Sequence, residues 1–437
     1  MINETLFINL IQAVVKSKLF ILFFLITNFS YSCSYAKSKD ESQKIQLGID
    51  NLIANNFADI KNKKVALFTN FSGRNVDGIL TAEILSKQKG FTLKYFFSPE
   101  HGFYGENHAG EKVENNEIFG IPIISLYGSL RRPPLNILRE LDVVLIDIQD
   151  IGIRSYTFLS SVNYMLTACA EAGIKAIVLD RPNPIGGNTV DGNITEKGCE
   201  TFMSLVPVPY IHGLTLGEIS LMMNKEGWLK NAEGKAMKCD VSVIKMSNWK
   251  RYMRWEDCDL LWFPTSPQIP TPDAIRGAAM FGIFGELSIF SIGIGTSMPF
   301  QYLGTPAMKV NKVYENINKH NFFGTLIQVS HFKPFYGKFA NTSCKGFIFK
   351  FPPSQNFAPY TTGIKIMLEV KKIHPELFIP EIVMESRRKM FEKVTGSNHL
   401  FNKIFSDATD EEILEVATQG LADFLIKREK YLLYPNE

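Results

Sequence analysis

The chain has 437 residues, of which 45% are hydrophobic and 21% are charged, and its 47 basic and 44 acidic side chains give a formal net charge of +3. This length predicts two folding units, and this composition is typical of a soluble globular protein with a large core. The small net charge is spread along the chain without blocks, which argues against a nucleic-acid-binding protein. Aromatic residues reach 12%, which core packing explains as well as sugar stacking does.

The first 33 residues have the pattern of an export leader. A basic flank precedes an apolar run at residues 19–27, which is shorter than the roughly 20 residues that span a bilayer. Cys33 and the polar segment after it resemble a lipoprotein processing site. We therefore predict a signal or lipoprotein leader at 1–33 and a tether at 34–44, with membrane attachment only through a lipid on Cys33. A plain secreted protein with an incidental cysteine is the alternative.

From residue 45 onward, apolar runs rich in β-branched residues alternate with segments of helical periodicity. Strands are predicted at 64–69, 93–97, 143–148, 175–180 and 259–263, with helices at 82–87 and around 160–172. Nearly continuous apolar strands that alternate with helices indicate a parallel sheet covered on both faces. The predicted fold class is therefore α/β, with an open, doubly wound, mostly parallel sheet.

The pattern changes near residue 300. A strand at 344–350 and an amphipathic helix at 410–427 are predicted there, without a dense set of polar loops. We predict a catalytic domain at 45–300 and a smaller C-terminal α+β domain at 301–437.

Each of the five predicted strands leads directly into a loop rich in Gly, Pro and polar side chains. These loops lie at 69–73, 98–102, 149–152, 181–184 and 265–270. Because the carboxyl ends of parallel strands lie along one edge of a sheet, the loops are expected to meet in space. The pattern predicts one cleft without naming its chemistry.

The loop at 98–102 contains Glu100 and His101. A carboxyl group that is partly desolvated by a cleft is suited to act as a general acid, and the histidine can contact a sugar or the carboxylate. A salt bridge or loop cap is the alternative for Glu100, and a structural role is the alternative for His101.

Further acids, Glu106, Glu111 and Asp150, lie on neighbouring loops. Glycoside hydrolysis commonly uses two carboxyl groups, about 5 Å apart for retention and about 6.5–9.5 Å apart for inversion. An N-acetyl sugar can also supply its own amide as the nucleophile, so one acid can suffice.

His212 precedes a predicted helix whose Thr215 and Glu218 have the spacing of a capping box. This pair is expected to be structural, whereas His212 is a candidate ligand contact.

Three arginines, Arg154, Arg181 and Arg276, flank the converging loops. An arginine fork can bind a carboxylate through two parallel hydrogen bonds. Pairing with a local aspartate such as Asp150 or Asp180 is the alternative.

Several classes of site have no support in the sequence. The segment 293–296 completes neither GxGxxG nor GxxxxGK[ST], and HExxH, GxSxG and His/Asp metal clusters are absent. We therefore predict no nucleotide, cofactor or metal. The cysteines after the leader show no CxxC and could form one or two disulfides, although buried thiols explain them more simply. They are Cys169, Cys199, Cys239, Cys258 and Cys344.

The order of these loops resembles that of the exo-β-N-acetylmuramidase (NamZ-type) glycoside hydrolases, formerly a domain of unknown function. The similarity covers residues 45–437, and the shared motifs are specific only together. They are Leu67-Phe-Thr-Asn70, Pro99-Glu-His-Gly-Phe103, Ala109-Gly-Glu-Lys112, 147–152 with Tyr156-Thr157, Asp180-Arg-Pro-Asn-Pro184, Asp191-Gly192, His212-Gly213 with Thr215, Gly217 and Glu218, and 266–272.

The resemblance implies a Rossmann-like domain, a smaller C-terminal domain and a cleft between them. It implies release of terminal N-acetylmuramic acid from the non-reducing end of peptidoglycan-derived glycans, and hence a periplasmic or outer-membrane lipoprotein of a bacterium. The glutamate of the family's Pro-Glu-His-Gly motif falls on Glu100, which becomes the expected catalytic acid, with His101 beside it. Expected substrate-binding residues are Asn70, Glu111, Asp150, Arg154, Arg181, Asn183, His212 and Glu286.

One stretch departs from the family pattern. Relatives carry Glu-Gly-Thr-Asn before a Gly-Arg-Gly-Thr turn, whereas Ile289 and Ile294 replace the polar and the cationic residue here. A different preferred sugar, elimination in place of hydrolysis, and loss of turnover in a muropeptide-binding lipoprotein are therefore alternatives. A hydrolase of an ester or phosphate is a further alternative, but it lacks a nucleophile motif or metal set.

Overall fold

The computed structural model describes residues 44–107, 116–128, 130–354 and 356–436, and residues 45–437 belong to one compact unit. The predicted leader, its Cys33 and nearly all of the predicted tether, as well as Glu111, lie outside the described residues. Within the described ranges, no helix has both the length and the apolar character needed to cross a bilayer.

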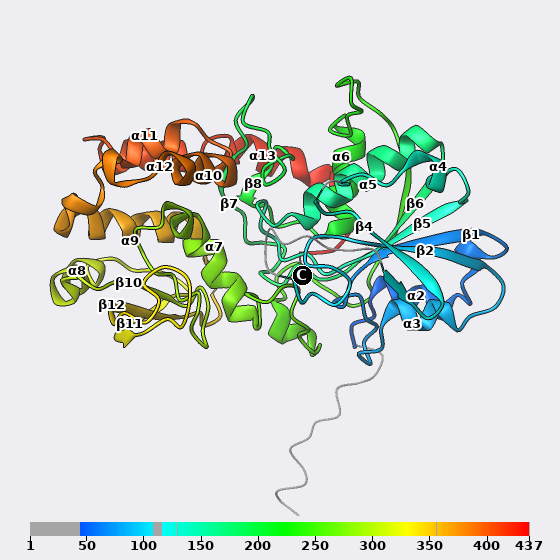
Figure 1. Cartoon of the computed structure of the whole chain (residues 1–437), viewed down its shortest axis with the longest axis horizontal. Coiled ribbons are helices and arrows are strands. Elements are labelled where there is room, and N and C mark those ends of the chain that lie inside the picture. The colour runs from blue at the N-terminus through cyan, green and yellow to red at the C-terminus, as the bar shows by residue number, and fades with distance from the viewer. Residues whose placement is uncertain (1–43, 108–115, 129, 355, 437) are drawn as a thin grey trace, which may run out of the picture. The chain divides into compact units, whose positions relative to one another are not determined.

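A seven-stranded sheet with the order β3-β4-β2-β1-β5-β6-β9 forms the N-terminal part of this unit (Figure 1). All neighbours in the sheet are parallel except β3, which is antiparallel to β4 at one edge. Without β3, the chain order of the strands is that of the Rossmann fold, so the predicted Rossmann-like, mostly parallel sheet is confirmed. The strands are β1 (Lys64–Thr69), β2 (Thr92–Ser98), β3 (Asn116–Ile118), β4 (Ile121–Ser125), β5 (Val143–Asp147), β6 (Lys175–Leu179) and β9 (Asp240–Ile244).

Helices cover both faces of this sheet because side chains alternate along each strand. Val65 and Leu67 of β1 pack in the same core cluster as residues of α2 and α3. Ala66 and Phe68 of the same strand pack in another cluster with residues of α4, α5 and α6. These helices are α2 (Gly48–Ala54), α3 (Thr81–Ser86), α4 (Leu135–Leu138), α5 (Phe158–Ala172) and α6 (Leu216–Lys225).

The predicted strand at 259–263 is wrong. This segment forms no strand, Leu261 in it is 68% exposed, and the indole of Trp262 donates a hydrogen bond to the carbonyl of Ile269. The sixth parallel strand is instead β9, an edge strand that is mostly half-buried. An edge strand needs fewer apolar residues than a central strand. The sequence of β9 is therefore less clearly strand-like than the short apolar run at 259–263.

The C-terminal part combines a three-stranded antiparallel sheet with helices, which confirms the predicted smaller α+β domain (Figure 1). The sheet order is β10 (Tyr302–Thr305), β12 (Cys344–Lys350), β11 (Leu326–Phe332). The helices are α7 (Pro272–Leu287), α8 (Val310–Ile317), α9 (Pro359–Ile373), α10 (Glu385–Thr395), α11 (His399–Ile404), α12 (Asp410–Ala417) and α13 (Leu421–Arg428). Helix α7 packs against α9 and α10, although it precedes the predicted domain boundary at residue 300.

Short elements complete the fold. The strands β7 (Asp191–Ile194) and β8 (Pro209–Ile211) form an antiparallel pair. The short 3₁₀ helices are η2 (Ala58–Ile60), η3 (Trp255–Cys258), η4 (Pro375–Leu377), η5 (Pro380–Ile382) and η6 (Glu429–Tyr431). The single helix predicted at 410–427 is wrong, because Gly420, with φ of 77°, separates α12 from α13.

The C-terminal segment returns to the N-terminal sheet. The hydroxyl of Tyr434 donates a 2.6 Å hydrogen bond to Asp180 at the end of β6, and Thr215 donates another of 2.7 Å to the same carboxylate. Burial raises the pKa of Asp180 to about 6. Thr215 also caps α6 together with Glu218, so the predicted capping box is confirmed.

Candidate active site

The carboxyl ends of β1, β2, β5 and β6 lie along one edge of the sheet and lead into the polar loops. The strand order reverses between β1 and β5, which is where open α/β sheets bind ligands. The hydroxyl of Thr69 donates a 2.6 Å hydrogen bond to the carbonyl of Asp147 and so ties these two strand ends together. The loops therefore converge, as a parallel sheet requires.

A cavity of about 280 Å³ lies between this edge and two helices of the C-terminal part. The loop after β2 contributes two residues, the loop after β5 several more, and α7 and α10 form another wall. Its polar and aromatic lining comprises Glu100, His101, Ser155, Tyr156, Thr157, Tyr210, Ser266, Gln268, Glu286 and Phe300.

Glu100 is 6% exposed and lines this cavity. Its Oε2 atom accepts a 2.5 Å hydrogen bond from the hydroxyl of Thr157, which is the N-cap residue of α5. The Thr157 side chain makes no capping bond to its own helix, and its backbone is already helical, with φ of −63° and ψ of −11°. The contact with Thr157 fixes the position of the Glu100 carboxyl group at the cavity wall.

His101 has a left-handed backbone with φ of 72°, which is uncommon for a residue other than glycine. Its Nδ1 atom lies 2.8 Å from the carbonyl oxygen of Asn107, so Nδ1 carries the proton and donates it. In the neutral tautomer with this proton, the lone pair is on Nε2. The ring also stacks on Tyr156, with 6.5 Å between the ring centroids.

Phe300 is a second cavity residue with a left-handed backbone, at φ of 63°. Its carbonyl approaches α7 so closely that a Cβ atom at Gly277 would lie 2.2 Å from the carbonyl oxygen. Non-glycine residues with such backbones cluster at functional sites, where the surrounding structure sustains the strain. Two of the eleven non-glycine residues with positive φ in the described ranges, His101 and Phe300, line this cavity.

The cavity wall also holds uncharged phenols. Burial raises the pKa of Tyr210 to about 12 and that of Tyr156 further above its usual range. The hydroxyl of Ser155 donates a 3.0 Å hydrogen bond to the Tyr210 oxygen. Both rings can pack against a sugar while their hydroxyl groups remain neutral.

Glu286, on the last turn of α7, is the second carboxyl group of the cavity. Burial raises its pKa, and the positive charge of Arg387 opposes that shift. No hydrogen bond to its carboxyl group is formed from the described part of the chain. Burial of this unpaired group therefore favours its protonated form.

Asp150 and His212 form a buried pair behind the cavity. The carboxylate of Asp150 accepts a 2.7 Å hydrogen bond from the Gly152 amide, and the Nδ1 atom of His212 accepts one of 3.2 Å from the Leu214 amide. The His212 Nε2 atom lies 3.6 Å from the nearer carboxylate oxygen. Both side chains are less than 9% exposed, so their observed contacts are with the loops.

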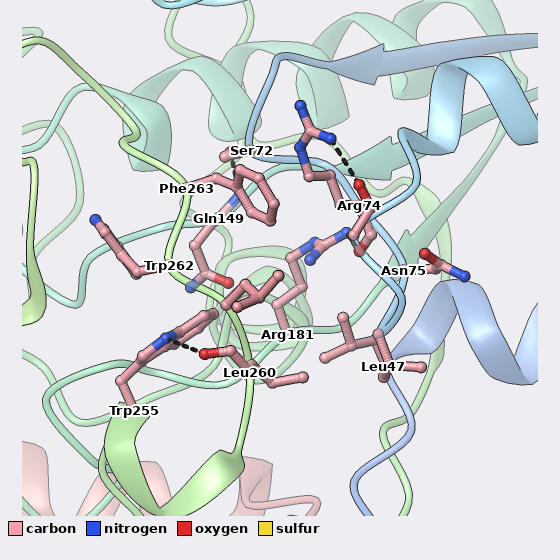
Figure 2. Close-up of a pocket in the computed structure, with 13 residues that line it drawn as sticks. Leu47, Ser72, Arg74, Asn75, Gln149, Arg181, Trp255, Leu260, Trp262 and Phe263 are labelled. Atoms are coloured by element: carbon pink, nitrogen blue, oxygen red, sulfur yellow. Dashed lines mark hydrogen bonds between the residues drawn. The ribbon is translucent and has the colours of Figure 1, made fainter.

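Arg181 lies beside a different, much smaller cavity of about 20 Å³, which has room for about one water molecule (Figure 2). Its guanidinium donates to both oxygens of Asp147, at 2.5 and 3.0 Å, and to the carbonyl of Arg74 at 2.5 Å. Arg74 itself contacts the rings of Phe71 and Phe263, whose centroids each lie 4.1 Å from its guanidinium carbon. Arg181 therefore joins the strand ends in this structure.

Asn70 and Asn183 shape loops. The Asn70 side-chain oxygen accepts hydrogen bonds from the amide and hydroxyl of Ser72, at 3.1 and 2.6 Å. The Asn183 amide donates to the Leu214 carbonyl at 3.0 Å. A Cβ atom at Gly152 would lie 2.4 Å from the Asn183 oxygen, which explains the glycine at that position.

Arg154 is 1% exposed, and its guanidinium donates hydrogen bonds to three backbone carbonyls. It donates to Asn193 at 2.6 Å, to Val208 at 2.7 Å and also to Thr395. Burial lowers the pKa of Arg154 to about 10. These contacts are with the main chain. Arg154 does not line the cavity, although it was expected to bind the substrate.

Arg276, the third arginine considered for carboxylate binding, is also paired. It binds Glu256 through two hydrogen bonds of 2.8 and 2.6 Å and Asp273 through one of 3.0 Å.

The structure thus brings Glu100, His101 and Glu286 to one cavity. It places Asn70, Asp150, Arg154, Arg181, Asn183 and His212 in the scaffold around it. The cavity lining also includes Thr157, Tyr210 and Phe300, none of which was predicted as a site residue. Of these three, only Thr157 belongs to a family motif, Tyr156-Thr157.

Within the ranges that the structure covers, no three His, Cys, Asp or Glu side chains are grouped so that they could hold a metal ion. The five cysteines after the leader are buried thiols there.

Two family models match the chain. The N-terminal model of exo-beta-N-acetylmuramidase NamZ matches residues 65–273, and the C-terminal model of the same family matches residues 279–434. The chain is 32% identical over 415 residues to the peptidoglycan beta-N-acetylmuramidase NamZ of Bacillus subtilis strain 168, an alignment that covers 94% of this chain and 97% of the relative.

Two crystal structures of DUF1343 family proteins from Bacteroides fragilis NCTC 9343 are similar in fold. One has a TM-score of 0.83 at 34% identity and covers 90% of this chain and 99% of its own. The other has a TM-score of 0.68 at 28% identity and covers 90% of this chain and 100% of its own.

Replacing Arg154 by methionine should lower the free energy of unfolding by about 3–5 kcal/mol, because three buried carbonyls lose a charged donor. Urea denaturation measures this change. Arg388→Met, at a partly exposed ion pair, is the control and should cost about 0.5–1 kcal/mol. If the Arg154→Met protein is as stable as the wild type but binds substrate poorly, Arg154 is a substrate-binding residue and not a structural one.

Replacing Glu286 by glutamine should make the protein more stable than the wild type at neutral pH. A carboxyl group whose pKa is raised in the folded state stabilises the protein below its unfolded-state value and loses that contribution as the pH rises through its folded-state value. The difference in melting temperature should therefore vanish towards pH 4. The exposed Glu315→Gln is the control, and a pH-independent difference for Glu286→Gln would contradict the effect of burial.

Proposed function

The chain belongs to the exo-beta-N-acetylmuramidase NamZ family, and we propose that it releases terminal N-acetylmuramic acid from the non-reducing end of peptidoglycan fragments. The family models cover most of the chain, and the Bacillus relative aligns along nearly its whole length. By this membership it is a glycosidase that acts on peptidoglycan. The observation that carries the finer proposal is the Glu100 carboxyl group, held by Thr157 at the wall of the cavity of about 280 Å³, which is called the main cavity below because it contains Glu100.

The size and lining of this cavity support action on a chain end. A volume of about 280 Å³ lies just below the range for small-ligand pockets, about 300–1,000 Å³. Such a cavity suits one sugar residue better than a long glycan. The rings of Tyr156, Tyr210 and Phe300 supply apolar faces for it, and Ser266 and Gln268 supply hydrogen-bonding groups.

In the proposed reaction, Glu100 gives its proton to the glycosidic oxygen while the bond from that oxygen to the anomeric carbon breaks. A water molecule then adds to the anomeric carbon and returns a proton to the Glu100 carboxylate. The sum is hydrolysis, with Glu100 regenerated. His101 lies beside it, with the Nε2 lone pair as an acceptor for a substrate hydroxyl or for water.

The residues in the scaffold around the cavity support Glu100 and His101 indirectly. The buried pair of Asp150 and His212 fixes the loops after β5 and β8. Arg181 joins the ends of the strands, and Asn70 and Asn183 shape turns. We propose that these five residues position the cavity wall, and that Glu286 contacts the substrate from α7.

Glu100→Gln should abolish turnover of a chromogenic N-acetylmuramide while the melting temperature changes little, because the amide keeps the shape of the side chain but cannot give up a proton. Loss of a general acid costs about 10²–10⁴-fold in rate. Mass spectrometry of the product distinguishes hydrolysis, which adds one water, from elimination, which adds none.

Glu106→Gln is the matched control, because Glu106 is an exposed acid near the same loop and does not line the cavity. Near-normal rates for Glu100→Gln would disprove its role. Binding of the muramide without any product from the wild-type protein between pH 5 and 8 would show a binding protein instead.

We also propose that the protein is exported and anchored by a lipid on Cys33, a proposal that the leader pattern supports. Cys33→Ser should then abolish incorporation of labelled palmitate and move the protein from the membrane to the soluble fraction. Labelling that persists in this variant would disprove the proposed anchor.

A further inference from the structure

The arginines expected to bind a substrate carboxylate are all engaged elsewhere. Arg154 donates to main-chain carbonyls, Arg181 binds Asp147, and Arg276 binds Glu256 and Asp273. The lining of the main cavity contains no lysine or arginine from the described ranges. A carboxylate on the substrate therefore needs another cation.

A second cavity, of about 290 Å³, adjoins the main one. The two share Gly282 and Glu286 of α7, four residues apart on one face of the helix, and Phe300 with its left-handed backbone. Because the same side chains line both volumes, a substrate bound beside Glu286 can extend from one into the other.

Two cations line this second cavity. They are Arg387 on α10 and Lys338 in the loop after β11. Arg387 and Val394 lie seven residues apart, which is about two helical turns, so one face of α10 borders both cavities. Helix α10 packs against α7, and this contact fixes the face beside Glu286.

Neither cation is neutralised by a close acid. Within the described ranges, no carboxylate oxygen lies within 4.0 Å of the side-chain nitrogens of Arg387 or Lys338. Arg387 and Glu286 line the same cavity, and the positive charge of Arg387 lowers the pKa of Glu286 against the larger, raising effect of burial.

Apolar side chains form part of the wall. Ile294 lines the second cavity together with Ile292 and Phe290, and Ser288 and Ser291 line it as well. Ile289 is 8% exposed and packs in the C-terminal core. Apolar neighbours lower the local dielectric and strengthen a charge-assisted hydrogen bond beside them.

We propose that Arg387, assisted by Lys338, binds a carboxylate of the peptidoglycan fragment in the second cavity and so selects N-acetylmuramic acid over an uncharged hexosamine. This inference rests on the proposed function and deepens it. The carboxylate comes from the lactyl group of the sugar or from a stem peptide attached to it, since both offer the same chemistry to a guanidinium.

The test compares the wild type with Arg387→Gln on three chromogenic substrates. These are an N-acetylmuramide with a free lactyl carboxylate, its lactyl methyl ester, and a muramide whose lactyl group carries a stem peptide. Arg387→Gln should lower kcat/KM for the free acid by about ten- to a hundredfold, the range for one charge-assisted hydrogen bond, and change that for the ester by less than twofold.

Arg388→Gln is the matched control, because this neighbouring arginine binds Glu392 on the same helix and Asn402 on α11 and lines neither cavity. Its kcat/KM values should stay within twofold of the wild type. Loss of activity by Arg387→Gln only on the peptide-bearing substrate would support the inference and identify the peptide as the source of the carboxylate. Equal rates for Arg387→Gln and Arg388→Gln on every substrate would overturn it.

Calorimetric binding separates this inference from the proposed function. If the wild type cleaves none of the muramides, the function fails, and the affinity for N-acetylmuramic acid relative to N-acetylglucosamine still tests Arg387. A preference for the acid that disappears in Arg387→Gln upholds the inference, and a preference that persists overturns it.

Discussion

The hydrogen bond from Thr157 to Glu100 connects two loops that the central sheet holds apart. Glu100 follows β2 and Thr157 precedes α5 after β5, while β1 lies between these strands. The contact spans the reversal in strand order, so it forms only when both crossovers have folded.

Buried arginines stabilise the loops on which this contact depends. Loops that leave the edge of a sheet expose carbonyl groups, and each of these needs a donor once it is buried. Arg154 satisfies carbonyls from three segments, including one beyond residue 390, and Arg251 pairs with Glu218 and donates to the carbonyl of Gly187. The planar, permanently charged guanidinium group suits this task because one arginine side chain can donate to several acceptors. Arginine near a functional loop is therefore poor evidence for a ligand contact by itself.

In the proposed mechanism, chemistry and selectivity come from different parts of the fold. The loops of the parallel sheet supply Glu100 and His101, whereas α7 and α10 supply Glu286 and Arg387. Glycine in α7 lets Ile292 pack closely against this helix, because a Cβ atom at Gly285 would lie 2.4 Å from the side chain of Ile292. Variation in the C-terminal helices can therefore change the preferred substrate while the catalytic loops stay intact.

The sequence by itself determined the parallel sheet, its polar edge and the position of Glu100 after β2, because apolar periodicity and turn residues are local signals. It did not determine the edge strand β9, whose half-buried residues give a weak pattern, or the break of the last long helix at Gly420. Only the tertiary structure decided which polar side chains face a cavity. Arg154 and Arg387 are both arginines near helices, yet one is enclosed by carbonyls and the other borders an open volume. Contacts between segments distant in the chain decide such differences, and no local pattern encodes them.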